Sequence, residues 1–407
     1  MRPAITEPVP PLDTFVVKVA SRCNLNCDYC YVYHSGDMSY REQPRRMPKH
    51  VVAALASRLR EHILATRLPA VSIIIHGGEP LLAGPQFFRE FVGAIREALP
   101  PDASASFGLQ TNGTLLTEDW ADLLCNLGIR IGISLDGPAE VNDLHRVDHA
   151  QRSSHLRTEH AVRLMLGTDL RLQHFSGILS VIDPTTDPVV VFDYFRTLGI
   201  DAVDFLLPDA TYEKSPPVSP DSKLYGDWLA ALFDCWIEQR NPHVRVRFFE
   251  TIVELLLGAG RSVDYIGGKP TRNAVIETDG GIEPVDVLKI CRDRFTKLGL
   301  NVLHNSLLSV CSHWLGAAYA AGNPAPCAIC RSCSVLDVCG GGYMPHRYSA
   351  AHGFDNPSVY CYALKRLILR IDQRLAQSIP NYPPRDVSHI VAPSPSAQQF
   401  FYSTGHS

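Results

Sequence analysis

Two groups of cysteines are the residues of this 407-residue sequence best suited to bind metal. The first group, Cys23, Cys27 and Cys30, follows a short apolar run in the stretch SRCNLNCDYC. Three thiolates can ligate three irons of a [4Fe–4S] cluster, whose usual protein complement is four. One iron would then stay open to another ligand, as in catalytic zinc sites. The alternative is a zinc site in which His34 is the fourth ligand.

The second group lies near the C-terminus, in CAICRSCSVLDVC, with a further cysteine at position 361. Such short spacing suits either an iron–sulfur cluster or a structural zinc site with four thiolates. The remaining cysteines are scattered, and Cys125 and Cys235 lie in apolar helical stretches. We expect these two to be small core residues.

The overall composition excludes several classes of protein. The chain is 45% hydrophobic and 20% charged, with a net charge of −4, so it lacks the basic character of a nucleic-acid-binding protein. The N-terminus has no apolar signal segment, and no apolar run approaches the ~18 residues that span a bilayer. We therefore expect a cytoplasmic protein with neither nucleic acid nor membrane as partner. Thiols in that compartment stay reduced and can serve as metal ligands.

From residue 14 to about 208, apolar runs alternate with helical patterns. The predicted strands cover 14–19, 71–76, 106–110, 130–134, 175–182 and 203–207, and the helices between them cover 48–66, 85–98, 117–127, 155–166 and 187–198. Continuous apolar strands that alternate with helices predict an α/β fold with a parallel sheet covered by helices. In such folds, ligands bind at the carboxyl ends of the strands.

The pattern changes after a stretch rich in proline and serine at 208–222. Two helices follow, at 222–239 and 248–258, then a hairpin at 273–286 and a last helix near 358–376. The predicted divisions are an N-terminal tail (1–13), the strand–helix region (14–208), a helical bridge (209–272), a cysteine-rich domain (273–380) and a loose C-terminal tail (381–407).

The cysteine triplet after the first strand, followed by five further strand–helix units, resembles the radical S-adenosylmethionine (SAM) superfamily. The stretch IIIHGGEP resembles that family's GGEP motif. The resemblance implies a partial (β/α)6 barrel and a [4Fe–4S] cluster on Cys23, Cys27 and Cys30, with SAM at the open iron. In the family, SAM is cleaved to a 5′-deoxyadenosyl radical that abstracts hydrogen from the substrate, so the cofactor supplies the difficult chemistry.

The same resemblance assigns a set of residues to SAM. Gly77 and Gly78 would let the backbone approach the ligand, and Glu79 and Pro80 complete the motif that meets the SAM amino group. Arg146 would meet the SAM carboxylate in a charge-assisted contact. The other implied SAM-site residues, most of them at strand ends, are Tyr29, Gln110, Asn112, Ser134, Asp136 and Ile182.

The stretches TNGTLL and ISLDGP, with the cysteine-rich module, resemble the SPASM branch of this superfamily, which acts mostly on peptides and proteins. The branch pattern implies that Cys330, Cys333, Cys339 and Cys361 ligate one auxiliary [4Fe–4S] cluster. Val285 and Tyr343 stand where that pattern has cysteines of another auxiliary cluster, so we expect only one. Cys327 could replace Cys330 as a ligand.

Several stretches, among them VKVASRCNLNCDYCYVYHSGD and ETDGGIEPVDVLK, look most like the FxsB-type maturases of ribosomal peptides. That resemblance implies hydrogen abstraction from a precursor peptide and a carbon–carbon cross-link (a cyclophane) or a related oxidation. Glu283 or Asp286 could accept the released proton, although a salt bridge to Lys289 or Arg292 would explain either carboxylate as well.

The implied partners are the precursor peptide and an external electron donor of the flavodoxin or ferredoxin type. We expect the peptide to be recognised by residues 209–275 or by a sheet edge. Two alternatives remain: dehydrogenation of serine or cysteine, as in sulfatase maturases, and a non-catalytic, zinc-containing peptide-binding protein.

Overall fold

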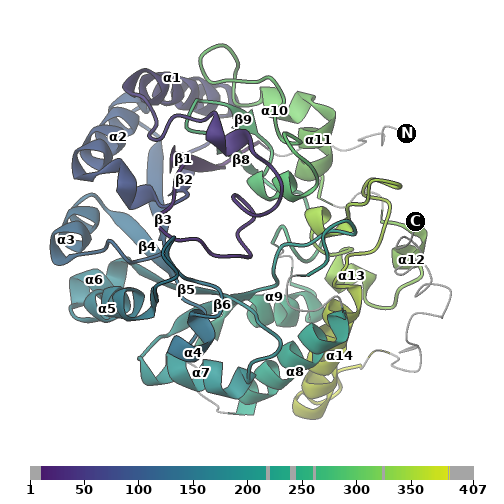
Figure 1. The fold of residues 1–407 in the computed structure, drawn as a ribbon. Helices are drawn as coiled ribbons and strands as arrows, with labels where there is room; N and C mark the ends of the chain where they lie inside the picture. Colours follow the sequence, from purple (N-terminus) through teal and green to yellow (C-terminus); the bar gives the residue numbers. More distant parts are fainter. Residues whose placement is uncertain are drawn as a thin grey trace.

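The predicted strand–helix alternation forms one curved sheet in the computed structural model (Figure 1). The structure describes residues 11–216, 221–238, 244–259, 263–322, 326–383 and 385. Most of the predicted terminal tails therefore lies outside the described residues.

The barrel sheet follows the order of the sequence. Its six main strands are β1 (Thr14–Ala20), β2 (Ala70–Gly77), β3 (Ser104–Thr111), β4 (Ile129–Ser134), β5 (Phe175–Val181) and β6 (Ala202–Leu206). Each strand pairs in parallel with the next, and the short β7 (Arg245–Val246) extends the sheet beyond β6. The parallel α/β fold predicted from the sequence is confirmed.

Helices cover the outer face of this sheet, as Figure 1 shows. They are α1 (Lys49–Thr66), α2 (Pro85–Ala98), α3 (Glu118–Asn126), α4 (Ala139–Asn142), α5 (His155–Leu166), α6 (Asp169–His174) and α7 (Pro188–Thr197). On β1, Phe15, Val17 and Val19 alternate along the strand and belong to the main hydrophobic core. Because successive side chains point to opposite faces of a strand, Lys18 is directed to the inner face, where it is buried.

The C-terminal third is joined to the barrel by both a strand and a helix. The strand β8 (Asn273–Ile276) pairs in parallel with β1 and forms a hairpin with β9 (Ile282–Glu283). The last helix, α14 (Cys361–Ser378), packs along α8 (Ser222–Glu238). Three arginine–carboxylate pairs connect those two helices: Arg366 with Asp227, Arg370 with Asp234 and Arg374 with Glu238.

Short elements complete the helical bridge and the cysteine-rich region. They are α9 (Arg247–Leu256), η3 (Asp286–Ile290), α10 (Ser309–Ser312), α11 (Trp314–Ala320), α12 (Ala328–Arg331), α13 (Leu336–Cys339) and η4 (Met344–Arg347). None of the helices in the described part of the chain has both the length and the apolar character needed to cross a membrane.

Candidate functional site

The three N-terminal cysteines lie in one loop that follows β1 and runs inside the arc of strands (Figure 1). A turn fixes the end of the loop, because the N–H of Cys30 donates to the carbonyl of Cys27 at 3.1 Å. The N–H of Leu25 donates to Sγ of Cys23 at 3.4 Å. A backbone donor directed at sulfur favours the thiolate form, which is the form that binds metal.

Residues 142–149 hold the cysteine loop from a second side. The N–H of Asn26 donates to the carbonyl of Val147 at 2.7 Å. Nε2 of His149 lies 3.0 Å from the carbonyl of Cys23. The segment that carries Arg146 therefore also sets the position of the cysteines.

The three thiols are poorly solvated, and this shifts their pKa values. Burial, followed by the charge of Glu79, raises the pKa of Cys23 to about 12. Burial raises the pKa of Cys27 to about 11, although Arg146 opposes the shift, and the pKa of Cys30 is raised as well. Burial disfavours the negative charge of the thiolates. A bound metal deprotonates a coordinating thiol, so the positive charge of an iron centre would offset this cost. The donor set, three clustered thiols with no fourth cysteine in the loop, fits the cluster that the resemblance implies.

The two glycines of the GGEP motif accommodate the cysteine loop itself. A Cβ atom on Gly77 would lie 2.1 Å from the carbonyl oxygen of Ala20, and one on Gly78 would lie 2.0 Å from the hydroxyl of Tyr33. The carbonyl of Arg22 would be 2.4 Å from the Cβ of Gly78. Protein backbone and a tyrosine therefore occupy the space beside these glycines, and the predicted close approach to SAM stays a prediction.

Glu79 is completely buried and fixes the end of the neighbouring strand. One carboxylate oxygen accepts from the N–H of Leu81 at 3.0 Å and from the hydroxyl of Thr111 at 2.8 Å. The other oxygen accepts from the N–H of Asn112 at 2.9 Å. Burial raises the pKa of Glu79, although these donors oppose the rise. Pro80 begins the short helix η2 (Pro80–Ala83) that Glu79 caps.

The predicted residues at the ends of β3 and β4 form two contacts. The amide nitrogen of Asn112 donates to Asn24 Oδ1 at 2.9 Å and lies 3.7 Å from Sγ of Cys23. Gln110 donates to the hydroxyl of Ser134 at 2.8 Å. Asn112 therefore lies directly beside the first cluster cysteine, whereas Gln110 and Ser134 bridge neighbouring strands.

Tyr29, Asp136 and Arg146 form a partly buried chain of polar contacts. The hydroxyl of Tyr29 donates to Asp136 Oδ2 at 2.6 Å and accepts from Arg146 Nη1 at 2.8 Å. Nε of Arg146 is buried without a hydrogen-bond partner among the described residues. A guanidinium with an unused donor beside the cysteines fits an incoming carboxylate. Ile182 is buried, and its N–H donates to the carbonyl of Leu206 at 2.9 Å.

His145 is a site residue that the sequence analysis missed. Its Nδ1 lies 2.9 Å from Asp28 in the cysteine loop, and its Nε2 lies 3.1 Å from Asp183 after β5. Burial lowers the pKa of His145, but the two carboxylates outweigh it and raise the pKa above its ordinary value. Its position next to Arg146 in the chain was the available signal.

The C-terminal cysteines also gather, although they come from three separate helices and a turn. The group consists of Cys327 before α12, Cys330 in α12, Cys333 after it, Cys339 at the end of α13 and Cys361 at the start of α14. Burial and the neighbouring thiols raise the pKa of Cys330, Cys339 and Cys361 to about 12 each. Together with Cys333, these three cysteines are the four predicted ligands and would provide the donor set of a closed four-thiolate cluster.

The zinc alternatives find no compact ligand set. Within the described part of the chain, no three His, Cys, Asp or Glu side chains are grouped closely enough to hold one metal ion. The ring of His34 contacts Asn26 Oδ1 at 3.1 Å. A tetrahedral zinc site needs four ligands around one ion, whereas thiolates of an iron–sulfur cluster bind different irons and can stand farther apart.

Comparisons with known proteins agree with this geometry. Residues 17–166 match the radical SAM superfamily. A cysteine-type anaerobic sulfatase-maturating enzyme of Clostridium perfringens is 30% identical over 285 residues, which cover 68% of this chain and 75% of that protein. The chain belongs to the radical SAM superfamily. It is therefore an enzyme whose family uses a [4Fe–4S] cluster and SAM, as the sequence predicted.

Two solved structures are similar in fold to this radical SAM enzyme. Native anSMEcpe with bound AdoMet and Cp18Cys peptide has a TM-score of 0.78 and 27% identity, and the match covers 91% of this chain and 99% of that one. SuiB of Streptococcus suis, bound to the precursor peptide SuiA, has a TM-score of 0.54 and 17% identity, with coverage of 83% and 72%. The second likeness concerns the fold alone.

Asp286 of this radical SAM enzyme lies against the cysteine loop. Its Oδ2 accepts from the hydroxyl of Tyr31 at 2.5 Å and is 2.8 Å from Nζ of Lys18. Burial raises the pKa of Asp286, but Lys18 and then His76 outweigh it and hold the pKa well below its ordinary value. The carboxylate is thus ionised at physiological pH and contacts Tyr31, the residue that follows Cys30.

The two glutamates of the hairpin are paired with lysines. Glu277 contacts Lys18 and Lys289, and these lysines lower its pKa to about 2 against the opposing effect of burial. Glu283 lies 3.3 Å from Lys289 and 3.2 Å from Lys297. The predicted ion pair with Lys289 therefore forms at Glu283. Asp286 pairs with Lys18 instead.

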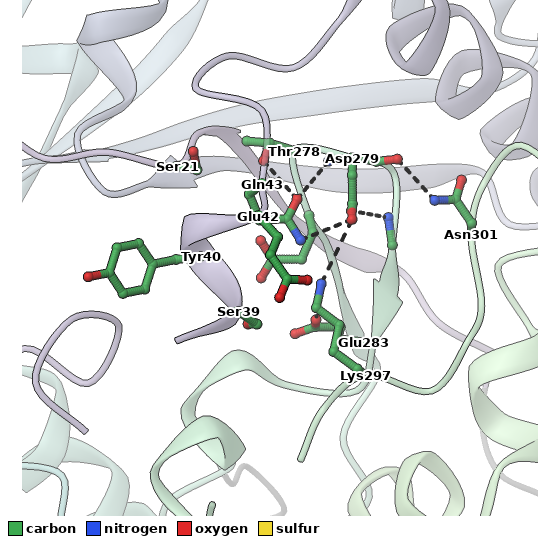
Figure 2. A network of polar contacts seen from close by, with 12 residues as sticks. Ser21, Ser39, Tyr40, Glu42, Gln43, Thr278, Asp279, Glu283, Lys297 and Asn301 are labelled. Carbon is green, nitrogen blue, oxygen red and sulfur yellow. Dashed lines mark hydrogen bonds and ion pairs between the residues drawn. The ribbon is translucent and has the colours of Figure 1, made fainter. Parts of the chain in front are cut away.

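Asp279, at the tip of this hairpin, connects it to the segment after the cysteine loop. Figure 2 shows Gln43, Lys297 and Asn301 pointing toward Asp279. Gln43 donates to its carboxylate at 3.0 Å and accepts from Thr278 at 3.1 Å. The hairpin and the chain that leaves the cysteine loop are thus held together by polar contacts.

Val285 and Tyr343 lie in a second, smaller hydrophobic cluster. Its buried members are Val285, Leu288, Ile290, Cys291, Leu315 and Tyr319, and Tyr343 packs against them with Tyr31, Phe295 and Tyr348. Apolar and aromatic side chains therefore surround both positions where the SPASM pattern has cysteines.

Proposed function

We propose that this radical SAM enzyme modifies a ribosomally made precursor peptide by abstracting hydrogen from a side-chain carbon and forming a carbon–carbon cross-link. One observation carries the proposal: the three-thiol loop, the unpartnered Nε of Arg146 and the ionised Asp286 lie together at the carboxyl ends of the barrel strands. This arrangement combines an open cofactor site with a proton acceptor.

The cofactor site would be held by the chain as follows. Cys23, Cys27 and Cys30 would ligate the cluster, and Arg146 would bind the SAM carboxylate. When bound, the cluster and SAM supply the deoxyadenosyl group that removes a hydrogen atom from the substrate. The remaining predicted SAM-site residues keep that role as part of the proposal.

Asp286 is the one of the two general-base candidates that contacts the cysteine loop. It is fixed by Lys18 and Tyr31, next to the cluster cysteines, whereas Glu283 is 1% exposed and enclosed by two lysines. Formation of the cross-link releases one hydrogen atom and one proton, and one electron must leave as well. We assign the proton to Asp286 and the electron to a carrier of the flavodoxin or ferredoxin type.

A peptide substrate is supported by the relatives. The neighbour at TM-score 0.78 was solved with a bound peptide, and its match covers 91% of this chain. The bridge at 209–216 lies beside the cysteine loop, since Lys214 donates to the carbonyl of His34. Part of the predicted recognition segment is therefore adjacent to the reaction centre.

The loss of one auxiliary cluster favours the cross-link, because other side chains stand at two of the positions where the SPASM pattern has its cysteine ligands. Val285 and Tyr343 pack in an apolar cluster, so the chain would keep one auxiliary cluster, on the C-terminal cysteines. This departure from the SPASM pattern supports a reaction other than that of sulfatase maturases.

Dehydrogenation of a serine or cysteine side chain is the second candidate. It is favoured by the likeness to the cysteine-type sulfatase-maturating enzyme of Clostridium perfringens, at 30% identity over 75% of that protein. Dehydrogenation of a serine and formation of the cross-link both remove two hydrogens from the peptide, so the change in mass alone cannot separate these two reactions.

Anaerobic co-expression with the small open reading frame beside the gene, followed by tandem mass spectrometry, tests the proposal. A loss of two hydrogens that joins two residues, so that fragmentation between them is suppressed, is the expected result. A change confined to one serine or cysteine would establish the second candidate instead. A peptide that stays unmodified while SAM is cleaved would contradict both.

A further inference from the structure

Five cysteines, one more than a closed cluster needs, meet in the C-terminal module. Cys327 and Cys330 are both buried, at 4% and 6% exposure. The thiol of Cys327 donates to Sγ of Cys330 across 3.5 Å. This separation is a hydrogen-bond distance and far exceeds the ~2.05 Å of a disulfide.

Backbone geometry holds the two thiols side by side. Cys327 precedes α12, whose first turn closes through a hydrogen bond from the N–H of Arg331 to the carbonyl of Cys327 at 3.0 Å. The N–H of Cys333 donates to the carbonyl of Cys330 at 3.0 Å. Residues three apart on a helical turn lie on the same face, so both sulfurs point to the same side of the module.

Both thiols also face the other predicted ligands. The charges of Cys327 and Cys361 contribute to the raised pKa of Cys330, and the charge of Cys327 contributes to that of Cys361. Burial lowers the pKa of Arg347, and the nearby Cys330, Cys327 and Cys339 oppose this shift. Its guanidinium donates to the carbonyl of Asn356 at 3.0 Å. Cys327 is therefore part of the same pocket and not a separate core residue.

We propose that Cys327 and Cys330 share one ligand position of the auxiliary cluster, either thiolate completing the shell with Cys333, Cys339 and Cys361. This inference rests on the proposed auxiliary cluster. A [4Fe–4S] cluster accepts four protein ligands, so the fifth thiol stays protonated and donates its S–H to the bound sulfur. Exchange moves one proton from the incoming thiol to the departing thiolate and needs no oxidant or reductant.

Single alanine variants of the anaerobically reconstituted full chain test the sharing. Cys330→Ala and Cys327→Ala should each keep about eight irons and eight sulfides per chain, the content of two clusters. Cys333→Ala, the matched control from the same turn, and the double variant Cys327→Ala/Cys330→Ala should each fall to about four. The SAM-cleavage activity that remains in the control shows that the barrel is intact.

Two outcomes would overturn the sharing. A fall to about four irons in Cys330→Ala alone would make Cys330 the sole ligand, and the same fall in Cys327→Ala alone would make Cys327 the sole ligand. If Cys330→Ala does not fold, the iron content of Cys330→Ser is compared with that of the double variant Cys330→Ser/Cys327→Ala. Sharing predicts that only the double variant has less iron than the native chain. A native chain with about four irons would instead refute the auxiliary cluster itself.

The reduction potential gives a second readout. Hydrogen bonds to cluster sulfurs raise the potential by stabilising the reduced, more negative form. Cys327→Ala should therefore shift the midpoint potential of the auxiliary cluster to a more negative value in an EPR-monitored titration. An unchanged potential would contradict the hydrogen bond between the two thiols.

Discussion

Arg146 is the residue whose surroundings point most directly to a ligand. Its guanidinium is buried, Nη1 donates to Tyr29, and Nε is left without a hydrogen-bond partner within the described chain. An unsatisfied buried donor costs about 1–3 kcal/mol, which a bound carboxylate would offset. The raised pKa of Arg146 keeps it charged at every working pH.

Replacement of Arg146 by alanine should weaken SAM binding by about 10- to 100-fold, the equivalent of one or two charge-assisted hydrogen bonds. Equilibrium titration of SAM into the reconstituted enzyme measures the change. Arg163→Ala is the matched control, because Arg163 is exposed on α5 and pairs with Glu159. Equal affinities in the two variants would remove Arg146 from the site.

Asp286→Asn should lower the yield of modified peptide by about 100-fold or more, the contribution of a general base, while SAM cleavage continues. Glu277→Gln is the control, because Glu277 contacts the same Lys18 and its loss disturbs the same ion-pair network. Both yields are measured by mass spectrometry of the peptide. If the two variants lose yield equally, the carboxylate acts only through the ion pair.

At the scale of elements, the cysteine loop is held between the end of β2 and residues 142–149. The N–H groups of Gly78 and Glu79 donate to the carbonyls of Ala20 and Arg22 at 2.8 and 2.9 Å. These contacts leave no space for a side chain at position 78. The position of the cluster ligands thus depends on the packing of backbone against backbone.

Gly78→Ala should displace this loop and reduce the iron content by about four atoms, the content of the SAM cluster. The added Cβ would meet a backbone carbonyl at 2.4 Å, which cannot move as a flexible side chain can. Gly93→Ala, in the middle of α2 with open space around it, should keep all iron and leave stability unchanged or slightly higher. A Gly78→Ala protein with native iron would show that the loop tolerates the displacement.

The contacts of His145 with Asp28 and Asp183 should make the stability of the site depend on pH. Since the folded pKa is raised, the stabilisation is complete below the ordinary value of 6.5 and is lost as the pH rises through the folded pKa. His145→Gln should lower Tm by about 1 °C at pH 6, for a loss of about 1 kcal/mol, and by less at pH 9. A difference in Tm that stays constant between these pH values would contradict the charged pair.

At the scale of the whole molecule, local patterns predicted most of the elements. The apolar run at 14–19 became β1, because its alternate residues pack under the helices. The parallel pairing of β8 with β1 was not predictable, since nothing within residues 273–276 specifies a partner so distant in the sequence. Lys18 illustrates the same limit, because a lysine in a strand indicates an exposed position until its partner Asp286 is known.

The candidate site also contains residues that the sequence predicted and residues that only the fold shows. The cysteines, Glu79 and Arg146 were found from motifs, because their chemistry requires those residue types at those spacings. His145 and the reason for Gly78 were missed, because both depend on contacts between segments that only the fold brings together. The surroundings of Tyr343 also emerged only with the fold, as an aromatic residue within an apolar cluster.

The iron and acid-labile sulfide content of the anaerobically reconstituted chain tests the central claim, one open and one closed cluster, most directly. We predict about eight irons and eight sulfides per chain, and Mössbauer spectra of two [4Fe–4S] centres of which only one changes when SAM is added. About twelve irons would mean that a third cluster forms despite Val285 and Tyr343. Zinc without sulfide would contradict the account as a whole.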